Sequence, residues 1–352
     1  MRRPLPSVFS ARRGPIRIVA IGGGTGLSIL LSGLKQYARP ALRTGKPIVD
    51  ITAVVTVTDD GGSSGRLRRD FDVLPPGDIR NCMAALCEEE AMLARLFNYR
   101  FAAGHGLKGH SFGNLFLTAL THITGDFAHA VSLSSEILAI CGKIYPSTAA
   151  NVELHAELEN GLRVSGESKI SKSRSRIKRI TLSPRRCDPV AETLTAIDQA
   201  DLITLGPGSL FTSIIPNLLV NGIPEAIAKS KAVKAYFCNL MWQPGETVNF
   251  SASEHVEAIL RHSRKGLLDY AVVNTQPITP GLLERYAYQR SLPVENDYDR
   301  MEKLGVKILG EGLLLAGEKV RHNPQIVAAI ALKLARLGRK RILLLEKSEK
   351  TK

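Results

Sequence analysis

The feature that most constrains the fold is an apolar segment that leads through a glycine-rich turn into an amphipathic segment. Residues 16–21 are mostly apolar, residues 22–26 read Gly-Gly-Gly-Thr-Gly, and a helical pattern runs from about Gly26 to Ala38. A glycine turn between a strand and a helix lets backbone N–H groups approach a ligand closely. The helix N-terminus adds unpaired donors and a partial positive charge, which suits a phosphate.

The same alternation of strand and helix recurs along the chain. Because the strand segments contain few polar residues, they are typical of parallel strands buried on both faces. We therefore predict an α/β fold, a Rossmann-like doubly wound and mostly parallel sheet with helices on both faces. Besides residues 16–21, the predicted strands are 51–57, 201–205, 233–238 and 270–273, and later helices are 190–199, 254–262, 281–289 and 324–337.

Four helix boundaries in the first half of the chain have sequence signals. Asp78 is expected to cap a helix after the Pro-Pro-Gly turn, and Asn114 is expected to lead another. A helix is predicted near 88–101, and Asp126 should cap one that ends near Gly142.

Residues 143–186 have a different pattern. Residues 152–158 alternate as in a strand, and Asn160-Gly161 is a hairpin signal. We predict a small β insertion at about 143–186 within a single domain spanning 15–340. A disordered basic extension at 1–14 and a basic tail at 341–352, frayed from Lys347, should flank that domain.

Composition excludes several classes of protein. No apolar run in the 352 residues approaches the roughly 20 needed to span a bilayer, and the N-terminus lacks the apolar core of a secretory signal. The five cysteines form no CxxC pair and lie in mostly apolar surroundings. They indicate reduced thiols in a cytoplasmic protein.

The net charge of +14 is concentrated in residues 1–15, 163–186 and 333–352, and the remainder of the chain is slightly acidic. Such blocks are usually solvated or contact acidic partners. Nucleic-acid binding is disfavoured because no aromatic residues interleave with the charges.

The glycine turn alone does not define a ligand. Leu27 occupies the last position of the dinucleotide fingerprint, and no Gly-Lys-Ser/Thr of a phosphate-binding loop follows. Asp59 and Asp60 at a neighbouring strand end are either turn residues or ligands of a ribose hydroxyl or Mg²⁺, and the adjacent glycine turn favours the functional interpretation.

Other polar residues are expected at the same sheet edge, where ligands of parallel sheets bind. Gly206 to Ser209 repeats the strand–glycine–helix pattern. Arg80 suits a phosphate, although a helix start would also explain it, and His110 with Asn114 is equally compatible with a structural role. Arg321 could contact a phosphate or simply lie at the surface. The candidate nucleotide-binding residues are Gly23, Gly24, Thr25, Gly26, Asp59, Asp60, Gly61, Gly62, Arg80, Asn81, His110, Asn114, Gly206, Pro207, Gly208, Ser209, Asn239, Gln243, Glu246, Thr247 and Arg321, with Asp59 and Asp60 as candidate Mg²⁺ ligands.

Six motifs in series resemble the gluconeogenesis factor family, relatives of 2-phospho-L-lactate transferase. They cover residues 16–335 and consist of residues 22–27, 58–65, 75–80, 109–114, 206–210 and 243–247. The resemblance implies a Rossmann-like cytoplasmic protein that binds a nucleotide sugar such as UDP-N-acetylglucosamine or UDP-glucose. In this family that binding is linked to carbon flow into cell-wall precursors and to cell shape.

Two departures limit the resemblance. Trp242 stands where the family tends to have a small hydroxyl residue, and the basic N-terminal extension lies outside the matched motifs.

The transferase relatives move a phospholactyl group onto a deazaflavin with Mg²⁺.

Three hypotheses remain open from the sequence. The first is a nucleotide-sugar-binding regulatory protein that signals to a protein partner and could form homo-oligomers. The second is a Mg²⁺-dependent transferase acting on a nucleotide-linked substrate. The third, a dinucleotide oxidoreductase, is disfavoured by Leu27. No nucleophile elbow or His-Glu-x-x-His motif is present, so hydrolase and metalloprotease interpretations have no support.

Overall fold

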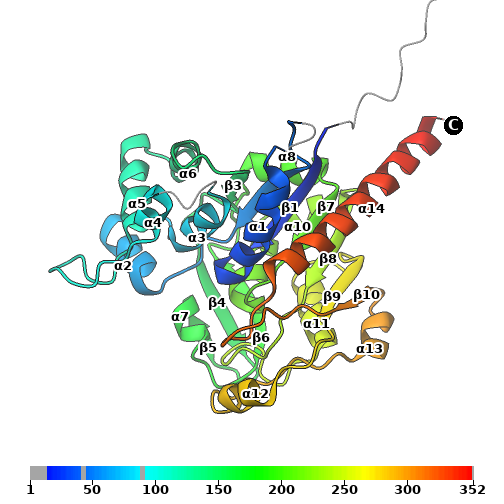
Figure 1. Cartoon of the computed structure of the whole chain (residues 1–352). Coiled ribbons are helices and arrows are strands. Elements are labelled where there is room, and N and C mark those ends of the chain that lie inside the picture. Colours follow the sequence, from blue (N-terminus) through cyan, green and yellow to red (C-terminus); the bar gives the residue numbers. More distant parts are fainter. Residues whose placement is uncertain (1–13, 41–44, 88–91, 351–352) are drawn as a thin grey trace, which may run out of the picture.

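The computed structural model describes residues 14–40, 45–87 and 92–350. Within these residues the chain forms a seven-stranded sheet of strand order β10-β9-β8-β7-β1-β2-β3, and every pairing in it is parallel. The predicted doubly wound α/β fold is confirmed (Figure 1). The strands of this sheet are β1 Ile16–Gly22, β2 Val49–Val55, β3 Lys143–Pro146, β7 Leu202–Leu205, β8 Val233–Phe237, β9 Tyr270–Asn274 and β10 Lys307–Glu311.

Helices cover both faces of the sheet. On one face α1 packs against α3 and α14, and on the other α8, α9, α10 and α11 lie together. The helices are α1 Gly24–Ala38, α2 Gly62–Phe71, α3 Gly77–Leu86, α4 Met92–Asn98, α5 Phe112–Thr124, α6 Phe127–Ile137, α7 Glu167–Ile170, α8 Ala191–Gln199, η1 Leu210–Ile214, α9 Ile215–Leu218, α10 Ile223–Lys229, α11 Ala252–His262, α12 Pro280–Ala287, α13 Tyr298–Lys303 and α14 Pro324–Lys350.

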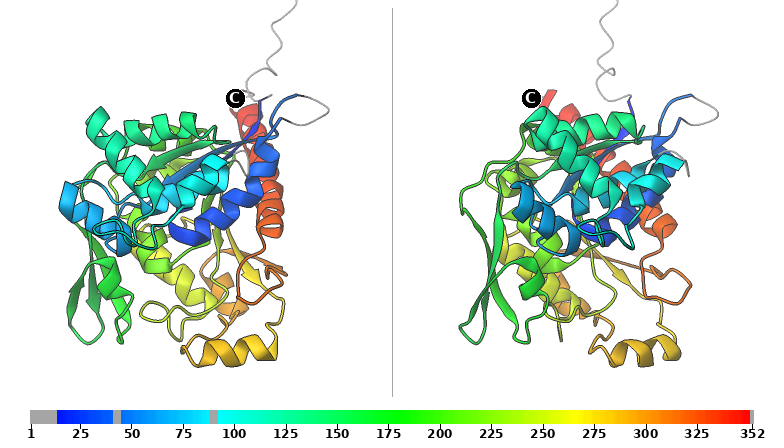
Figure 2. Two further views of the ribbon diagram at one scale, coloured as in Figure 1. Left: turned by 60° about the vertical axis from the view of Figure 1, so that its left-hand side comes forward. Right: turned by 90° about the vertical axis from the view of Figure 1, so that its left-hand side faces the viewer.

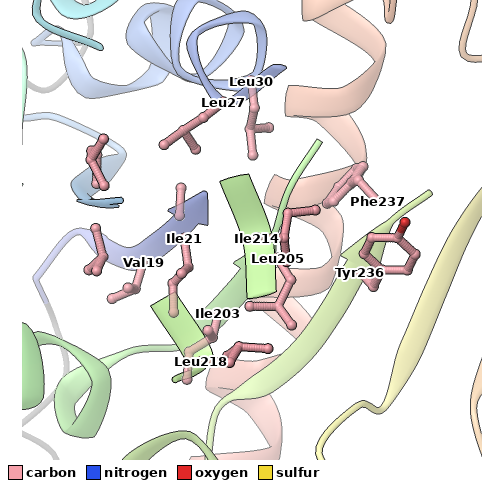
Figure 3. Close-up of a cluster of buried hydrophobic side chains, with 14 of the residues drawn as sticks. Val19, Ile21, Leu27, Leu30, Ile203, Leu205, Ile214, Leu218, Tyr236 and Phe237 are labelled. Atoms are coloured by element: carbon pink, nitrogen blue, oxygen red, sulfur yellow. The ribbon is translucent and has the colours of Figure 1, made fainter. Parts of the chain in front are cut away.

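The hydrophobic core lies on both sides of the central strands. All four residues of β7 and all five of β8 are buried, as expected for central parallel strands, and they include Lys234 of β8. Figure 3 labels ten members of this core, contributed by β1, α1, β7, η1, α9 and β8. Burial on both faces fixes these strands and so fixes where the loops at their carboxyl ends emerge.

A second, antiparallel sheet forms the predicted β insertion. Its strands are β4 Glu153–Leu158, β5 Arg163–Ser165 and β6 Ile177–Ser183, in the order β5-β4-β6. The predicted hairpin at Asn160-Gly161 joins β4 to β5. Figure 2 shows this sheet extending away from the parallel sheet. The predicted start at 143 is wrong, because β3 pairs with β2 and belongs to the main sheet.

Several predicted boundaries are corrected. Ser111, not Asn114, caps α5 through a hydrogen bond from the Asn114 N–H. Asp126 caps α6 as predicted, but the helix ends at Ile137 because Ala139 adopts a positive φ and the chain turns toward β3. The helix predicted at 88–101 is present as α4, and residues 88–91 lie outside the described residues.

The C-terminal helix is longer than the sequence pattern suggests. Asn323 caps α14 as predicted, but the helix continues to Lys350 where a frayed tail was expected from Lys347. Gly338 allows the helix to approach the Asp201 carbonyl, and Ile342 is buried. These contacts stabilise the last turns, which intrinsic propensity alone would leave marginal. The extension predicted at 1–14 lies almost wholly outside the described residues.

In the described part of the chain no single helix is long and apolar enough to cross a membrane. One bent pair, Leu210–Leu218 with Ile223–Lys229, meets the length and composition criteria together. Most of its large apolar side chains belong to the core described above.

Candidate functional site

A cleft opens at the carboxyl ends of β1, β7 and β8. Its volume is about 600 Å³, and its walls come from the loops after β1, β7 and β8, from segments 289–291 and 320–322, and from single residues of helices such as α3, α7 and α12. The chain proceeds from β1 to β2 on one side and from β7 to β8 on the other. The cleft therefore lies at the topological switch point of the sheet, where open α/β proteins bind ligands.

The two glycine loops pack directly against each other at the base of the cleft. The Gly206 N–H donates to the Ile21 carbonyl at 2.9 Å. A side chain at Gly26 would collide with the Pro207 carbonyl, so that glycine is required for packing between the loops. Gly24 and Gly208 adopt positive φ angles that favour glycine. The predicted loops thus meet and form one wall.

A chain of amide and hydroxyl groups forms a second wall. The Gln243 side chain donates to Ser209 Oγ at 2.8 Å and accepts from Asn239 Nδ2 at 2.8 Å. Thr247 is fully buried and its hydroxyl accepts from the Gln243 N–H at 3.0 Å. Asn239, Gln243 and Ser209 face the cleft, whereas Thr247 holds their loop in place.

Three acids line the cleft: Glu246 is buried, and Asp78 and Glu167 are half-buried. Burial raises the pKa of Asp78 to about 7, although a hydrogen bond from the Gly24 backbone opposes the shift. Burial also raises the pKa of Glu246 to about 7, while its carboxylate accepts from the Phe211 N–H and the Thr212 hydroxyl, each at 3.1 Å. The pKa of Glu167 rises further, to about 9, through burial and its acidic neighbours.

Asp78 corrects a prediction. No side chain caps α3: its N-cap residue is Pro76, and Asp78 lies within the first turn. The Asp78 carboxylate instead meets the start of α1, where its Oδ2 would lie 2.5 Å from a side chain at Gly23. The partial positive charge at that helix start therefore already faces a carboxyl group.

Arg321 lies at the rim of the cleft. It is exposed, and the described residues offer its guanidinium neither a hydrogen bond nor an ion pair. The neighbouring His322 is buried and hydrogen-bonds the Cys238 carbonyl through Nε2 at 3.1 Å, which fixes the backbone beside Arg321. Trp242 also lines the cleft, with its indole N–H donated to the Phe250 carbonyl at 3.0 Å.

Several predicted residues do not line this cleft. β2 ends at Val55, so three residues separate it from Asp59 and Asp60. Asp59 Oδ1 accepts from the Gly61 N–H at 2.9 Å, and Asp60 Oδ1 accepts from the Ser168 N–H at 2.8 Å. Gly61 and Gly62 form the start of α2, a helix that the sequence pattern did not reveal. The hydrogen bond between Ser168 and Asp60 therefore connects this loop to the insertion.

A second buried polar cluster gathers four other predicted residues beside α3 and α5. Ser63 Oγ lies 2.9 Å from His110 Nδ1 and accepts from Asn114 Nδ2 at 3.1 Å. Arg80 donates to Asn98 at 2.8 Å and to Asn81 at 2.5 Å. These contacts satisfy only part of the polar atoms, because Arg80 Nε and Asn114 Oδ1 are buried and have no hydrogen-bond partner among the described residues. The ligand role predicted for these side chains stays a prediction.

The described residues contain no group of three or more His, Cys, Asp or Glu side chains arranged to hold a metal ion. Mg²⁺ is commonly held by one or two carboxylates together with substrate phosphates. Asp59 and Asp60 each use one oxygen for a backbone N–H. Their assignment as Mg²⁺ ligands therefore stays a prediction.

Glu167, Ser171, Ser213 and Tyr286 also line the cleft, although they were not among the predicted site residues. Two of them had a signal: Glu167 is the single acid in the basic segment 163–186, and Ser213 follows the second glycine loop. Ser171 and Tyr286 lie in segments without a recognisable ligand pattern.

The fold and the cleft define a doubly wound α/β protein with a polar cleft at its switch point. The chain belongs to the 2-phospho-L-lactate transferase CofD family, which matches residues 18–314.

Relatives that carry the name gluconeogenesis factor are similar over nearly the whole chain. The Bacillus subtilis protein is 46% identical over 319 residues, which cover 90% of this chain and 98% of that protein. The Halalkalibacterium halodurans protein is 46% identical and covers 90% of this chain and 95% of its own length. A crystal structure of a Bacillus halodurans protein, 46% identical, matches with a TM-score of 0.86 over 90% of this chain and 99% of that one.

Proposed function

We propose that this chain is a cytoplasmic regulatory protein that binds a nucleotide sugar of the UDP-N-acetylglucosamine type. In this proposal it links gluconeogenic growth to cell-wall precursor supply and cell shape through a protein partner. The name gluconeogenesis factor among its relatives supports the regulatory part. One observation carries the binding part: a single cleft joins two glycine loops, an amide pair and the Arg321 guanidinium, which has no partner among the described residues.

The groups in the cleft match the parts of a nucleotide diphosphate. Backbone N–H groups of glycine loops bind phosphate oxygens, and Arg321 would add a cation at the rim. Asn239 and Gln243 present amide donors and acceptors, which suit a base edge or a ribose hydroxyl. A volume of about 600 Å³ is in the range of ordinary small-molecule sites.

A second candidate is a Mg²⁺-dependent transferase of the phospholactyl type acting on a nucleotide-linked substrate. The family description and the three carboxyl groups along the cleft support it. Carboxyl groups with pKa values raised toward neutrality are suited to proton transfer. Turnover of a bound nucleotide sugar that Asp78→Asn abolishes would favour this candidate over a purely regulatory protein.

Calorimetric titration with UDP-N-acetylglucosamine, UDP-glucose, GDP and NAD, with and without Mg²⁺, tests the proposal. We expect a uridine nucleotide to bind below millimolar concentration. Arg321→Ala should weaken that binding about tenfold, the effect of one charge-assisted contact. Arg336→Ala makes the same charge change on an exposed face of α14 and should have no effect. Absence of binding by both uridine nucleotides would refute the proposal.

A further inference from the structure

The insertion places one acidic side chain in the cleft. Glu167 is the first residue of α7, between β5 and β6, and it lines the cleft together with Ser171. The Ser168 N–H donates to Asp60 at 2.8 Å, and Gly166 with a φ of 91° lies against the same carboxylate. The Ser171 backbone also lies against Gly245, where a side chain would collide with the Ser171 carbonyl. The start of α7 is therefore fixed relative to the main domain.

The Glu167 carboxyl has no partner of its own. Its Oε2 is buried and makes no hydrogen bond, an uncommon and costly state for a carboxyl oxygen. Its charged neighbours are the acids Asp78, Asp59, Glu246 and Asp60. Arg321 is the only Lys or Arg among the described lining residues. The charges that act most strongly on Glu167 are therefore negative, and the one guanidinium described in the cleft lining belongs to Arg321.

We propose that Glu167 is a specificity-determining residue that binds a hydroxyl or amide group of the glycosyl part of the ligand. This inference rests on the proposed nucleotide-sugar function. A phosphate beside Glu167 would lie among four acids, Asp78, Asp59, Glu246 and Asp60, and be repelled. At the glycine loops, the acid in contact is Asp78. A neutral group rich in hydrogen-bond donors satisfies the orphan oxygen without that penalty. In this arrangement the glycine loops bind the diphosphate, and Glu167 of the insertion contacts the glycosyl group attached to it.

Comparison of UDP-N-acetylglucosamine with UDP isolates the glycosyl contact. By calorimetry, Glu167→Ala should weaken UDP-N-acetylglucosamine binding about tenfold, which corresponds to one buried hydrogen bond to an acid. UDP affinity should stay within about twofold, because UDP lacks the glycosyl group. Glu167→Gln retains an acceptor and a donor and should lose less. Glu159→Gln, at an exposed position before the hairpin turn, is the matched control and should bind both ligands as the unmodified protein does.

The other possible results separate failure of the Glu167 assignment from failure of the proposed function. Equal weakening of both ligands, or no change in either, overturns the assignment of Glu167 to the glycosyl group. Weakening of UDP in Mg²⁺ but not in EDTA overturns it in favour of a cation-mediated phosphate contact. If the unmodified protein binds neither ligand, the proposed function itself fails and this inference with it. Melting temperatures of all variants check that each one is folded.

Discussion

Gly26 and Asp78 each fit more than one role in the sequence, and their surroundings in the fold show which contacts they make. Gly26 resembles a phosphate-loop glycine, yet it is required for contact with Pro207. Asp78 resembles a helix cap, yet it faces the start of α1 from inside the cleft. The sequence pattern placed both residues close to the loops that form the cleft. It could not say which loop each would meet, because that depends on strand order.

The acids that line the cleft should make stability depend on pH. The pKa of Glu167 in the folded chain, about 9, lies above the ordinary value of 4.5 expected after unfolding. The folded chain therefore binds more protons between these values, and the free energy of unfolding falls as pH rises through this window. Glu167→Gln replaces the carboxyl group by an amide that does not ionise, so it removes this contribution to the pH dependence.

Urea denaturation at pH 5.5 and pH 8.5 measures this effect. The loss of unfolding free energy between the two pH values should be smaller in Glu167→Gln than in the unmodified protein. In Glu159→Gln, the loss of unfolding free energy between the two pH values should equal that in the unmodified protein. An identical pH dependence in all three proteins would contradict the raised pKa of Glu167.

At the scale of elements, the insertion is held to the domain by few polar contacts, and His262 of α11 provides one. Its Nε2 accepts from the Ile180 N–H of β6 at 3.0 Å, while Nδ1 donates to the Ala258 carbonyl at 2.7 Å. Burial lowers the pKa of His262 to about 4, so the ring is neutral and can accept at Nε2. This contact fixes the sheet that carries Glu167.

His262→Ala should destabilise the protein by about 1–3 kcal/mol, because it leaves a buried N–H of β6 unpaired. Urea denaturation at pH 7 measures the change. The rate of amide hydrogen exchange should rise most in β6, where the Ile180 N–H loses its acceptor. His129→Ala, at an exposed position of α6, should change neither quantity. Unchanged exchange at Ile180 in His262→Ala would show that this contact does not hold the insertion.

Across the whole molecule, the C-terminal helix ties the last part of the chain to the first strand. Asp201 is fully buried, and it accepts from Arg339 Nη2 at 2.6 Å and from the Arg17 N–H at 2.8 Å. Arg339 also donates to the Gly14 and Pro15 carbonyls. The ion pair joins α14, the start of β7 and the chain before β1 at the sheet edge opposite the cleft.

Asp201→Asn should destabilise the protein by about 3 kcal/mol, since removing one partner of a buried ion pair leaves the other charge uncompensated. Thermal and urea denaturation at pH 7 measure the loss. Asp198→Asn, exposed on α8, makes the same chemical change without a buried partner and should be nearly neutral. Equal stability of the two variants would contradict a structural role for the pair.

Sequence patterns alone predicted five of the seven strands of the parallel sheet, many of the helices that alternate with them and the antiparallel insertion, because apolar runs and turn residues are local signals. They did not reveal β10, and they assigned β3 to the insertion. They also placed the two glycine loops, Asn239, Gln243, Glu246 and Arg321 at the cleft. Tertiary structure decided that Asp59, Arg80 and His110 lie outside the cleft lining and that Glu167 lies within it. Those outcomes depend on long-range packing: the insertion turns α7 back toward the switch point, and no local pattern encodes that approach.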